Sequence, residues 1–276
     1  MKRQKTHIDY IFMDSGTGGL PYMRHLIEKS PNAHCVYVAD TKNFPYGEKS
    51  HGTIKKLAHK VLDSLLELYT PNAVVIGCNT LSIVALDYFR KTFPDILFVG
   101  TVPAIKSAGN FSKNRRIGLL ATNRTVESDY TQRLIHDFAK DCEVISRGDP
   151  ELISFIENSF FFASEKEKEA MVKPAIDFFR SKNVDTIILG CTHFLHIIDI
   201  ANKLASPDIT VIDSCAGVVN QALRIAPINN DPNDQSPTQL FFITGHDETI
   251  DDESFQNRYQ TIAQKMNITY GGIIPQ

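Results

Sequence analysis

Short apolar runs alternate along this chain with longer stretches in which apolar residues recur at helical spacing. Between Ile54 and Tyr69 the leucine, isoleucine and valine side chains return mostly every three or four positions, which predicts one buried face of a helix. The short runs are apolar at successive positions, which predicts strands buried on both faces. The predicted strands are Ile8–Met13, Cys35–Ala39, Ala73–Ile76, Leu97–Gly100, Ile117–Ala121, Glu143–Ser146, Thr186–Leu189, Thr210–Ile212 and Leu240–Ile243. The longer predicted helices include Lys55–Tyr69, Val126–Lys140, Glu165–Arg180 and Gln256–Met266.

This order of elements indicates βαβ units, in which parallel strands form a sheet that helices cover. A weak internal repeat is also present, because Val75-Ile76-Gly77-Cys78-Asn79-Thr80 can be laid over Ile188-Leu189-Gly190-Cys191-Thr192-His193. We therefore predict an α/β fold of two similar domains, each a mostly parallel sheet flanked by helices, with the active site in the cleft between them.

Two breaks in the pattern suggest where the domains meet. A strand ends at a proline near Thr101–Pro103, and a second break lies near Asp213–Gly217. We expect residues 1–102 to form the first domain, completed by residues 214–276, and residues 103–213 to form the second. The last segment holds one clear strand and one clear helix, too little for a domain of its own. Its stretch Pro227–Pro237, rich in Asn, Asp and Pro, predicts an exposed loop.

Composition narrows the classes of function. The chain has 276 residues, 42% of them hydrophobic, so a sizeable core is expected. The formal net charge of −3 favours neither a nucleic-acid nor a membrane partner. The five cysteines show no framework spacing, and neither a signal-type stretch nor a membrane span is apparent. We expect a cytoplasmic protein with reduced thiols.

Two of the cysteines, Cys78 and Cys191, occupy matching positions. Each follows an apolar run and a glycine and precedes a helical pattern, over Leu81–Phe89 and Phe194–Leu204 respectively. Ligands of parallel α/β sheets bind beyond the carboxyl ends of the strands, and a helix N-terminus favours a thiolate. A single such cysteine is more often a small core residue, but the matched pair favours one chemistry that needs two thiols.

Other uses of these thiols are less well supported. Cys78, Cys191, His193 and Cys215 contain donors that zinc accepts. No Cys-x-x-Cys or His-x-x-x-His spacing supports such a site, so no metal is expected. A dithiol redox centre has equally little support, because nothing local brings the two thiols into bonding distance.

A glycine-rich turn is the third candidate feature. The run Ile11–Met13 leads into Asp14-Ser15-Gly16-Thr17-Gly18-Gly19, and a helix is expected to follow. Such a turn at a helix start suits an anionic ligand, and Asp14 could bind an amine or accept a proton. A purely structural turn is the alternative. An aspartic protease would need a second carboxylate motif, and the Gly-Lys-Ser/Thr of a phosphate loop is missing.

Three further features are weaker on their own. The polar loop that contains Pro45-Tyr46-Gly47 could hold a carboxylate with its backbone amides, although a surface turn is the favoured reading. His193 lies two positions after Cys191 and could tune that thiol. Glu157 has no distinguishing context in the sequence.

Taken together, these motifs resemble those of glutamate racemases of the bacterial cell-wall pathway. The resemblance rests on Asp14-Ser15-Gly16 with Gly18-Gly19-Leu20, Asp40 with Pro45-Tyr46-Gly47, Cys78-Asn79-Thr80, Ala121-Thr122 with Thr125, and Gly190-Cys191-Thr192-His193, which occur in the family's order. Aspartate racemases share the two-cysteine plan but typically carry Glu at the position of His193, which favours glutamate as the substrate. An aspartate or broader amino-acid racemase and a non-catalytic amino-acid binding protein are the alternatives.

The resemblance implies cofactor-independent racemisation between L-glutamate and D-glutamate, with Cys78 acting as base on the D-isomer and Cys191 on the L-isomer. Pyridoxal phosphate is not implied, and a homodimer is left open. The implied catalytic residues are Cys78, Cys191, Asp14, His193 and Glu157. The implied substrate-binding residues are Asp14, Ser15, Pro45, Tyr46, Gly47, Asn79, Thr80, Thr122, Thr125, Thr192 and His193.

The chain departs from the family pattern at several positions. Arg147-Gly148-Asp149-Pro150 stands where a Cys-Pro-rich stretch often precedes the position of Glu157. Arg124 replaces a usual glycine, Thr101-Val102-Pro103 lacks the usual Glu-Pro, and Phe194-Leu195 replaces Tyr-Pro. These departures mostly avoid the residues that the reaction would use.

Overall fold

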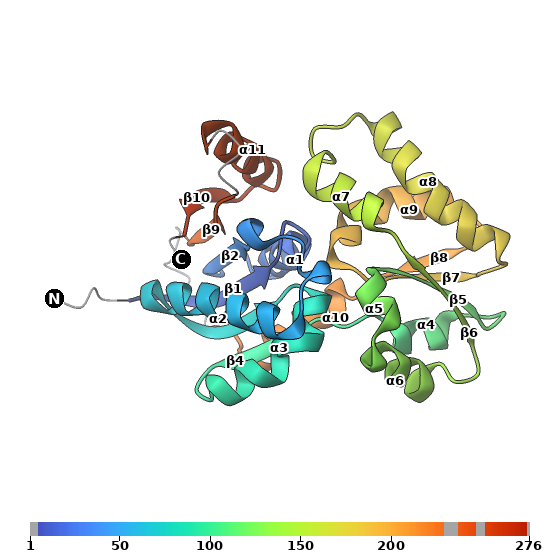
Figure 1. The fold of residues 1–276 in the computed structure, drawn as a ribbon, viewed down its shortest axis with the longest axis horizontal. Helices are drawn as coiled ribbons and strands as arrows, with labels where there is room; N and C mark the ends of the chain where they lie inside the picture. Colours follow the sequence, from blue (N-terminus) through green and yellow to red (C-terminus); the bar gives the residue numbers. More distant parts are fainter. Residues whose placement is uncertain (1–4, 229–236, 247–251, 275–276) are drawn as a thin grey trace. The chain divides into compact units, whose positions relative to one another are not determined.

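The computed structural model describes residues 5–228, 237–246 and 252–274 (Figure 1). The chain divides into two compact units, which we call unit 1 and unit 2. Unit 1 comprises Met1–Thr101 and Cys215–Gln276, and unit 2 comprises Val102–Ser214. Each unit is built around one parallel sheet with helices against it, so the predicted α/β fold class is confirmed.

Unit 1 contains a six-stranded sheet in the order β10-β9-β2-β1-β3-β4, in which every pairing is parallel. Its elements are β1 (Thr6–Asp14), α1 (Leu20–Lys29), β2 (Cys35–Ala39), the 3₁₀ turns η1 (Thr41–Asn43) and η2 (Tyr46–Glu48), α2 (His51–Leu68), β3 (Tyr69–Ile76), α3 (Asn79–Thr92), β4 (Leu97–Gly100), α10 (Cys215–Ile225), β9 (Gln239–Ile243), α11 (Asp252–Lys265) and β10 (Thr269–Ile273).

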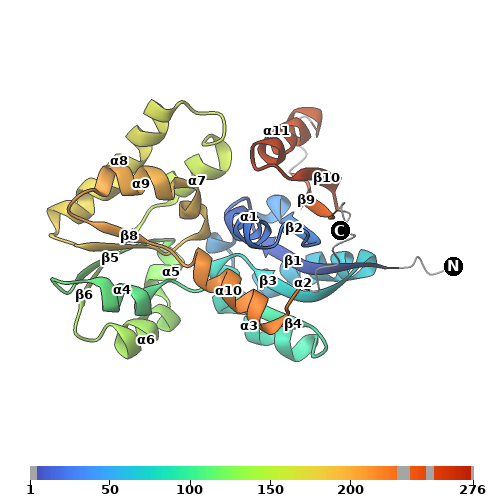
Figure 2. The ribbon, with the colours of Figure 1, turned by 180° about the vertical axis from the view of Figure 1, so that it is seen from behind.

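The central strand of this sheet is buried on both faces. Tyr10, Ile11 and Phe12, which point alternately to the two sides of β1, have no exposed surface. The apolar faces of α2 and α3 pack with β1 and β3 in one core. Helix α10 packs beside α1, although the two lie far apart in the sequence (Figure 2).

Unit 2 contains a four-stranded parallel sheet in the order β6-β5-β7-β8. Helices α8 and α9 lie on one side of it, and α4 and α6 lie on the other (Figure 1). Its elements are α4 (Ile105–Phe111), β5 (Arg116–Ala121), α5 (Asn123–Glu127), α6 (Asp129–Phe138), β6 (Glu143–Gly148), α7 (Pro150–Asn158), α8 (Glu165–Ser181), β7 (Thr186–Leu189), the 3₁₀ helix η3 (Thr192–Ile197), α9 (Ile198–Ala205) and β8 (Thr210–Ile212).

Three predicted helices need correction. The stretch Val126–Lys140 belongs to two helices, α5 and α6, because the Ser128 hydroxyl caps a new helix by accepting the Thr131 amide at 3.1 Å. The stretch Phe194–Leu204 begins as the 3₁₀ helix η3 and continues as α9. Tyr69 is the first residue of β3 rather than the last of a helix.

The C-terminal segment holds more regular structure than its pattern predicts. It adds helix α10 and strand β10 to the predicted strand and helix, and β9 pairs with β2 in the sheet of unit 1. Strand β10 reads Thr-Tyr-Gly-Gly-Ile, which lacks an apolar run, and this explains why the pattern missed it. Most of the loop predicted for Pro227–Pro237 lies outside the described residues. Within the described ranges, no helix combines the length and apolar character that crossing a membrane requires.

Candidate active site

The two cysteines occupy equivalent positions in two sheets of equivalent topology. The order β2-β1-β3-β4 of unit 1 is repeated as β6-β5-β7-β8 in unit 2. Met13 pairs with Ile76, and Leu120 pairs with Leu189, in the same register. Cys78 and Cys191 each follow that last paired residue by two positions, at the carboxyl end of the sheet where parallel α/β proteins bind ligands.

Cys78 lies at the beginning of α3. It is the N-cap residue, and its Sγ accepts the Leu81 backbone N–H at 3.5 Å. Only 6% of the residue is exposed. The amides and partial positive charge of a helix N-terminus favour a thiolate over a thiol. Asn79 and Thr80, the first two residues of the helix, are buried beside it.

The glycine-rich turn after β1 packs closely against the strand end that carries Cys78. A Cβ on Gly19 would lie 2.8 Å from the Gly77 carbonyl oxygen, so only glycine fits there. The Tyr37 hydroxyl holds the turn by accepting the Gly19 N–H at 3.0 Å and donating to the Gly16 carbonyl at 2.7 Å. As predicted, a helix, α1, follows the turn.

Asp14 is the last residue of β1 and is almost completely buried. Its Oδ1 accepts the Ser15 backbone N–H at 2.6 Å. The Ser15 hydroxyl lies 3.3 Å from the same oxygen. The carboxylate therefore has a fixed orientation at the carboxyl end of the sheet, as a group that assists proton transfer requires.

The loop with Pro45, Tyr46 and Gly47 is held in place by the buried side chain of Tyr46. Tyr46 is 1% exposed and donates its hydroxyl to Asp40 Oδ2 at 2.5 Å. Burial raises the pKa of Tyr46 well above its usual value, and the nearby acidic groups Asp40, Cys78 and Asp14 raise it further. The favoured reading of this loop as a surface turn is therefore wrong for Tyr46, while Pro45 and Gly47 are half-buried.

Asp40 and Thr244 help to form this part of the site, although neither is among the site residues that the resemblance implies. Thr244, just beyond β9, donates its hydroxyl to Asp40 Oδ1 at 2.7 Å, and the Asn43 amide donates to the same carboxylate. Asp40 follows β2 directly, so both residues lie at the carboxyl edge of the sheet. The sequence contains a signal for both residues, because each directly follows a predicted strand, and the carboxyl ends of parallel strands meet at one edge of a sheet.

In unit 2, the structure joins Cys191, His193 and Glu157 into a chain. The His193 Nδ1 lies 3.8 Å from the Cys191 Sγ, and its Nε2 lies 3.0 Å from Glu157 Oε2. The exposed fractions of the three residues are 6%, 3% and 2%. Glu157 comes from the last turn of α7, whereas the other two follow β7.

The pKa of His193 reflects this arrangement. Burial alone lowers the pKa of an imidazole, because it penalises the charged form. Hydrogen bonds and charges of Cys191 and Glu157 outweigh that effect and hold the pKa of His193 well above its usual value. The raised pKa favours an imidazolium, whose Nε2 faces the Glu157 carboxylate and whose Nδ1 faces the Cys191 sulfur.

The remaining candidates in unit 2 are threonines in the segments that follow β5 and β7. Thr122 caps α5, with its Oγ1 accepting the Thr125 N–H at 3.1 Å and donating to the Thr125 hydroxyl at 3.0 Å. Thr125 and Thr192 are buried. Within the described part of the chain, no group of three or more His, Cys, Asp or Glu side chains is arranged to hold a metal ion.

Comparison with known proteins agrees with this geometry. The family model described as Asp/Glu/Hydantoin racemase matches residues 17–222. A glutamate racemase of Treponema pallidum is 34% identical over 275 residues, which is 99% of each chain. The chain belongs to the Asp/Glu/Hydantoin racemase family. A second member, the glutamate racemase of Bartonella bacilliformis, is 39% identical over 210 residues, covering 75% of this chain and 78% of its own.

The fold matches solved structures of this racemase family. The Escherichia coli glutamate racemase, solved in complex with L-glutamate and the activator UDP-MurNAc-Ala, has a TM-score of 0.83 and 27% identity, with 99% of each chain covered. The resemblance to glutamate racemases that the motifs indicate is therefore confirmed, as is the expectation of an isomerase acting on amino acids.

Proposed function

We propose that the protein interconverts L-glutamate and D-glutamate by moving a proton at Cα between two cysteine thiols. The observation that carries the proposal is the register equivalence of Cys78 and Cys191, each buried at the carboxyl end of the same strand of a repeated sheet. Racemisation needs a base on one face of the carbon and an acid on the other. Two equivalent thiols meet that need in both directions.

In this mechanism one of the two cysteines starts as a thiolate and the other as a thiol. With L-glutamate bound, the Cys191 thiolate removes the α-proton and becomes a thiol, while the Cys78 thiol delivers its proton to the opposite face and becomes a thiolate. With D-glutamate the two exchange roles. One proton is therefore shared by the two sulfurs throughout, and no cofactor takes part in the proposal.

The surrounding residues have distinct tasks in this scheme. The Glu157–His193 pair stabilises the charged state of Cys191, and Asp14 assists on the side of Cys78. Amides at the starts of α3 and η3, with the side chains of Asn79, Thr80 and Thr192, are suited to hold carboxylates. Ser15, the Pro45–Gly47 loop, Thr122 and Thr125 complete the proposed substrate contacts.

Membership of the glutamate racemase group supports a biological role as well. The curated relatives that align over nearly the whole chain carry the name glutamate racemase. We therefore propose that the protein supplies D-glutamate as a precursor for peptidoglycan synthesis, as the resemblance to cell-wall racemases implies.

The direct test compares four cysteine variants. Cys78→Ala and Cys191→Ala should each lower racemisation at least a thousandfold, since each removes one of the two groups that move the proton. Cys215→Ala in unit 1 and Cys142→Ala in unit 2 remove half-buried thiols that no proposed step uses, so both variants should stay within twofold of the parent. In D₂O the product should carry deuterium at Cα. Retention of hydrogen at Cα, or activity within tenfold of the parent in either of the first two variants, contradicts the mechanism.

Substrate choice and catalysis can be separated in one further assay. A pocket fitted to glutamate should turn over aspartate about 10- to 200-fold less efficiently, the usual value of one methylene. A non-catalytic binding protein would instead bind glutamate without changing its optical rotation, and its cysteines would alkylate at the rate of ordinary thiols. Equal turnover of the two amino acids would indicate a broader racemase.

A further inference from the structure

The tetrad Arg147-Gly148-Asp149-Pro150, where the sequence departs from the family pattern, forms the junction between β6 and α7. Asp149 is the N-cap of α7, and its Oδ1 accepts the Leu152 N–H at 3.1 Å. Pro150 occupies the first helical position, which its fixed φ favours. A Cβ on Gly148 would lie 1.8 Å from the Asn123 Oδ1 and 3.2 Å from the Asn123 backbone nitrogen, so glycine lets α5 and the Asn123 side chain pack closely here. Each residue of the tetrad thus has a structural task.

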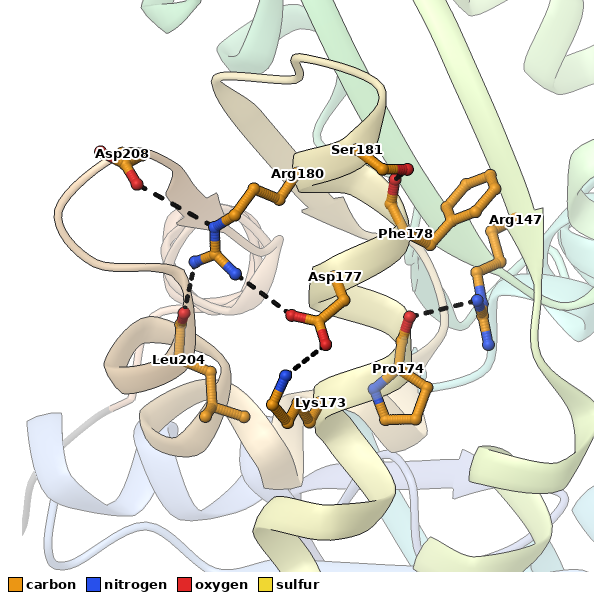
Figure 3. Close-up of polar contacts among 9 residues, drawn as sticks. All are labelled: Arg147, Lys173, Pro174, Asp177, Phe178, Arg180, Ser181, Leu204 and Asp208. Carbon is orange, nitrogen blue, oxygen red and sulfur yellow. Dashed lines mark hydrogen bonds and ion pairs between the residues drawn. The ribbon is translucent and has the colours of Figure 1, made fainter.

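Arg147 ties this junction to a second helix. Its Nε and Nη2 both donate to the same oxygen, Asp149 Oδ2, at 3.0 and 2.8 Å, and form an ion pair with that carboxylate. Its Nη1 donates to the Pro174 carbonyl in α8 at 3.3 Å, and its guanidinium lies 5.4 Å from the centre of the Phe178 ring (Figure 3). One side chain therefore holds the start of α7 against the middle of α8.

Helix α7 transmits that constraint to the active site. It buries Leu152, Ile153 and Ile156 on one face, and the same helix carries Glu157 about two turns, or about 12 Å, beyond its cap. Glu157 makes the 3.0 Å contact with His193. Because one continuous helix joins the Asp149 cap to Glu157, we expect a shift at Asp149 to displace Glu157 as well.

The other unit contains the counterpart of this junction. Asp14 pairs with Ala39 and Ala121 pairs with Gly148, so Asp40 and Asp149 occupy the same register position, one residue beyond the second strand of each sheet. Asp40 anchors Tyr46, which lies close to Cys78. The repeated fold thus uses the same position twice to fix a residue near a cysteine.

From these contacts we infer that Arg147 and Asp149 are positioning residues of the racemase reaction, which set the Glu157–His193 hydrogen bond by fixing the start of α7. The inference rests on the proposed function for its link to turnover, whereas the link to the environment of Cys191 stands without it. Neither residue touches the proposed reacting atoms.

The experiment compares Arg147→Ala, Arg147→Lys, Asp149→Asn and the double variant Arg147→Ala/Asp149→Asn with Arg180→Ala. Asparagine keeps the capping oxygen and removes only the charge pair. Arg180 is the matched control, because it is an arginine on the side of α8 away from the Arg147 contact (Figure 3). It binds Asp177 and the Leu204 carbonyl and faces Asp208. Two readouts are measured: racemisation of glutamate and the rate at which iodoacetamide alkylates Cys191 and Cys78 in the same molecule, resolved by peptide mass spectrometry.

We expect Arg147→Ala and Asp149→Asn each to lower kcat about tenfold with KM within twofold, because small misplacements of a catalytic group reach about 10²-fold in rate. Alkylation of Cys191 should slow at least threefold at pH 7 while that of Cys78 stays unchanged. Arg147→Lys should recover part of both effects, and the double variant should resemble the singles, since the two residues act as one unit.

Two results would overturn the inference. One is an equal change in the alkylation of both cysteines, which would indicate general loosening of the fold. The other is a Cys191 rate in Arg147→Ala and Asp149→Asn that matches Arg180→Ala. If the parent protein fails to racemise glutamate, the proposed function falls, but the alkylation rates still decide whether Arg147 positions Glu157. If Arg147→Ala does not fold, Asp149→Asn and Arg147→Lys carry the test.

Discussion

Glu157 Oε2 lies 3.0 Å from His193 Nε2, although 36 positions separate the two residues in the sequence. Both side chains are almost completely buried, and the other imidazole nitrogen faces Cys191. A buried carboxylate needs a partner of this kind, because an isolated charge in a protein interior is costly. The pair therefore links one residue of α7 to the cysteine that follows β7.

Substituting Glu157→Gln should lower kcat about 10- to 100-fold, since a hydrogen bond to a charged group contributes roughly 1.5–3 kcal/mol. The substitution keeps the shape of the side chain and removes its charge. Steady-state kinetics in both directions measure the effect. Glu151→Gln, an exposed residue in the first turn of the same helix, is the control. Equal kcat for the parent and Glu157→Gln would show that the pair does not act on the reaction.

The same pair makes stability depend on pH. Because the folded-state pKa of His193 is raised above its unfolded value, the protonated imidazole stabilises the fold fully below about pH 6.5, the unfolded pKa, and this contribution is lost as the pH rises through the folded pKa. The urea midpoint of the parent should therefore fall as the pH increases above about 6.5. The midpoint of Glu157→Gln should change less steeply with pH. Parallel curves for the two proteins would contradict the assignment.

Thr244→Val tests the anchor of the Tyr46 loop. The change removes the hydroxyl that donates to the buried Asp40 carboxylate and accepts the Lys42 N–H at 3.2 Å. We expect a loss of about 1–3 kcal/mol of stability and a KM for glutamate raised more than kcat is lowered. Thr41→Val is the matched control, since Thr41 donates to the neighbouring Gly245 carbonyl and not to Asp40. An unchanged KM in Thr244→Val would separate this loop from substrate binding.

Gly19→Ala should damage both stability and turnover. The added methyl would lie 2.8 Å from the Gly77 carbonyl and 3.1 Å from the Tyr37 hydroxyl, so the turn must move away from the strand end that carries Cys78. We expect a cost of about 1–3 kcal/mol and at least a tenfold loss of kcat/KM. Gly52→Ala, near the start of α2 and with open space around it, should be neutral or stabilising by about 0.5–1 kcal/mol. Thermal melts and kinetics of the two variants provide the comparison.

Much of the fold could be predicted because the signals are local. Strands buried on both faces appear as apolar runs, and all nine predicted strands are present in the structure. Strand β10 was missed because its pairing with β9, rather than its own residues, makes Thr269–Ile273 extended. Helices α5 and α6 were merged, since a capping serine at position 128 interrupts a pattern that otherwise continues.

Some residues of the candidate site could likewise be predicted from local sequence, and others could not. Cys78, Cys191, Asp14 and His193 could be selected from sequence alone, because each stands at a strand end or beside a cysteine in a repeated motif. Glu157 had no local signal, and its assignment came from the family resemblance alone. Its partnership with His193 depends on how α7 packs against η3.

The sequence by itself determined the class of fold, the repeated sheet and the two cysteines, because periodicity and motif spacing act over a few residues. Only the tertiary structure decided which polar side chains share a buried partner: Glu157 with His193, Asp40 with Tyr46 and Thr244, and Arg147 with Asp149 and α8. The physical reason is that a buried polar group must find its partner wherever the chain brings one within about 3 Å, and most of these partners are distant in sequence.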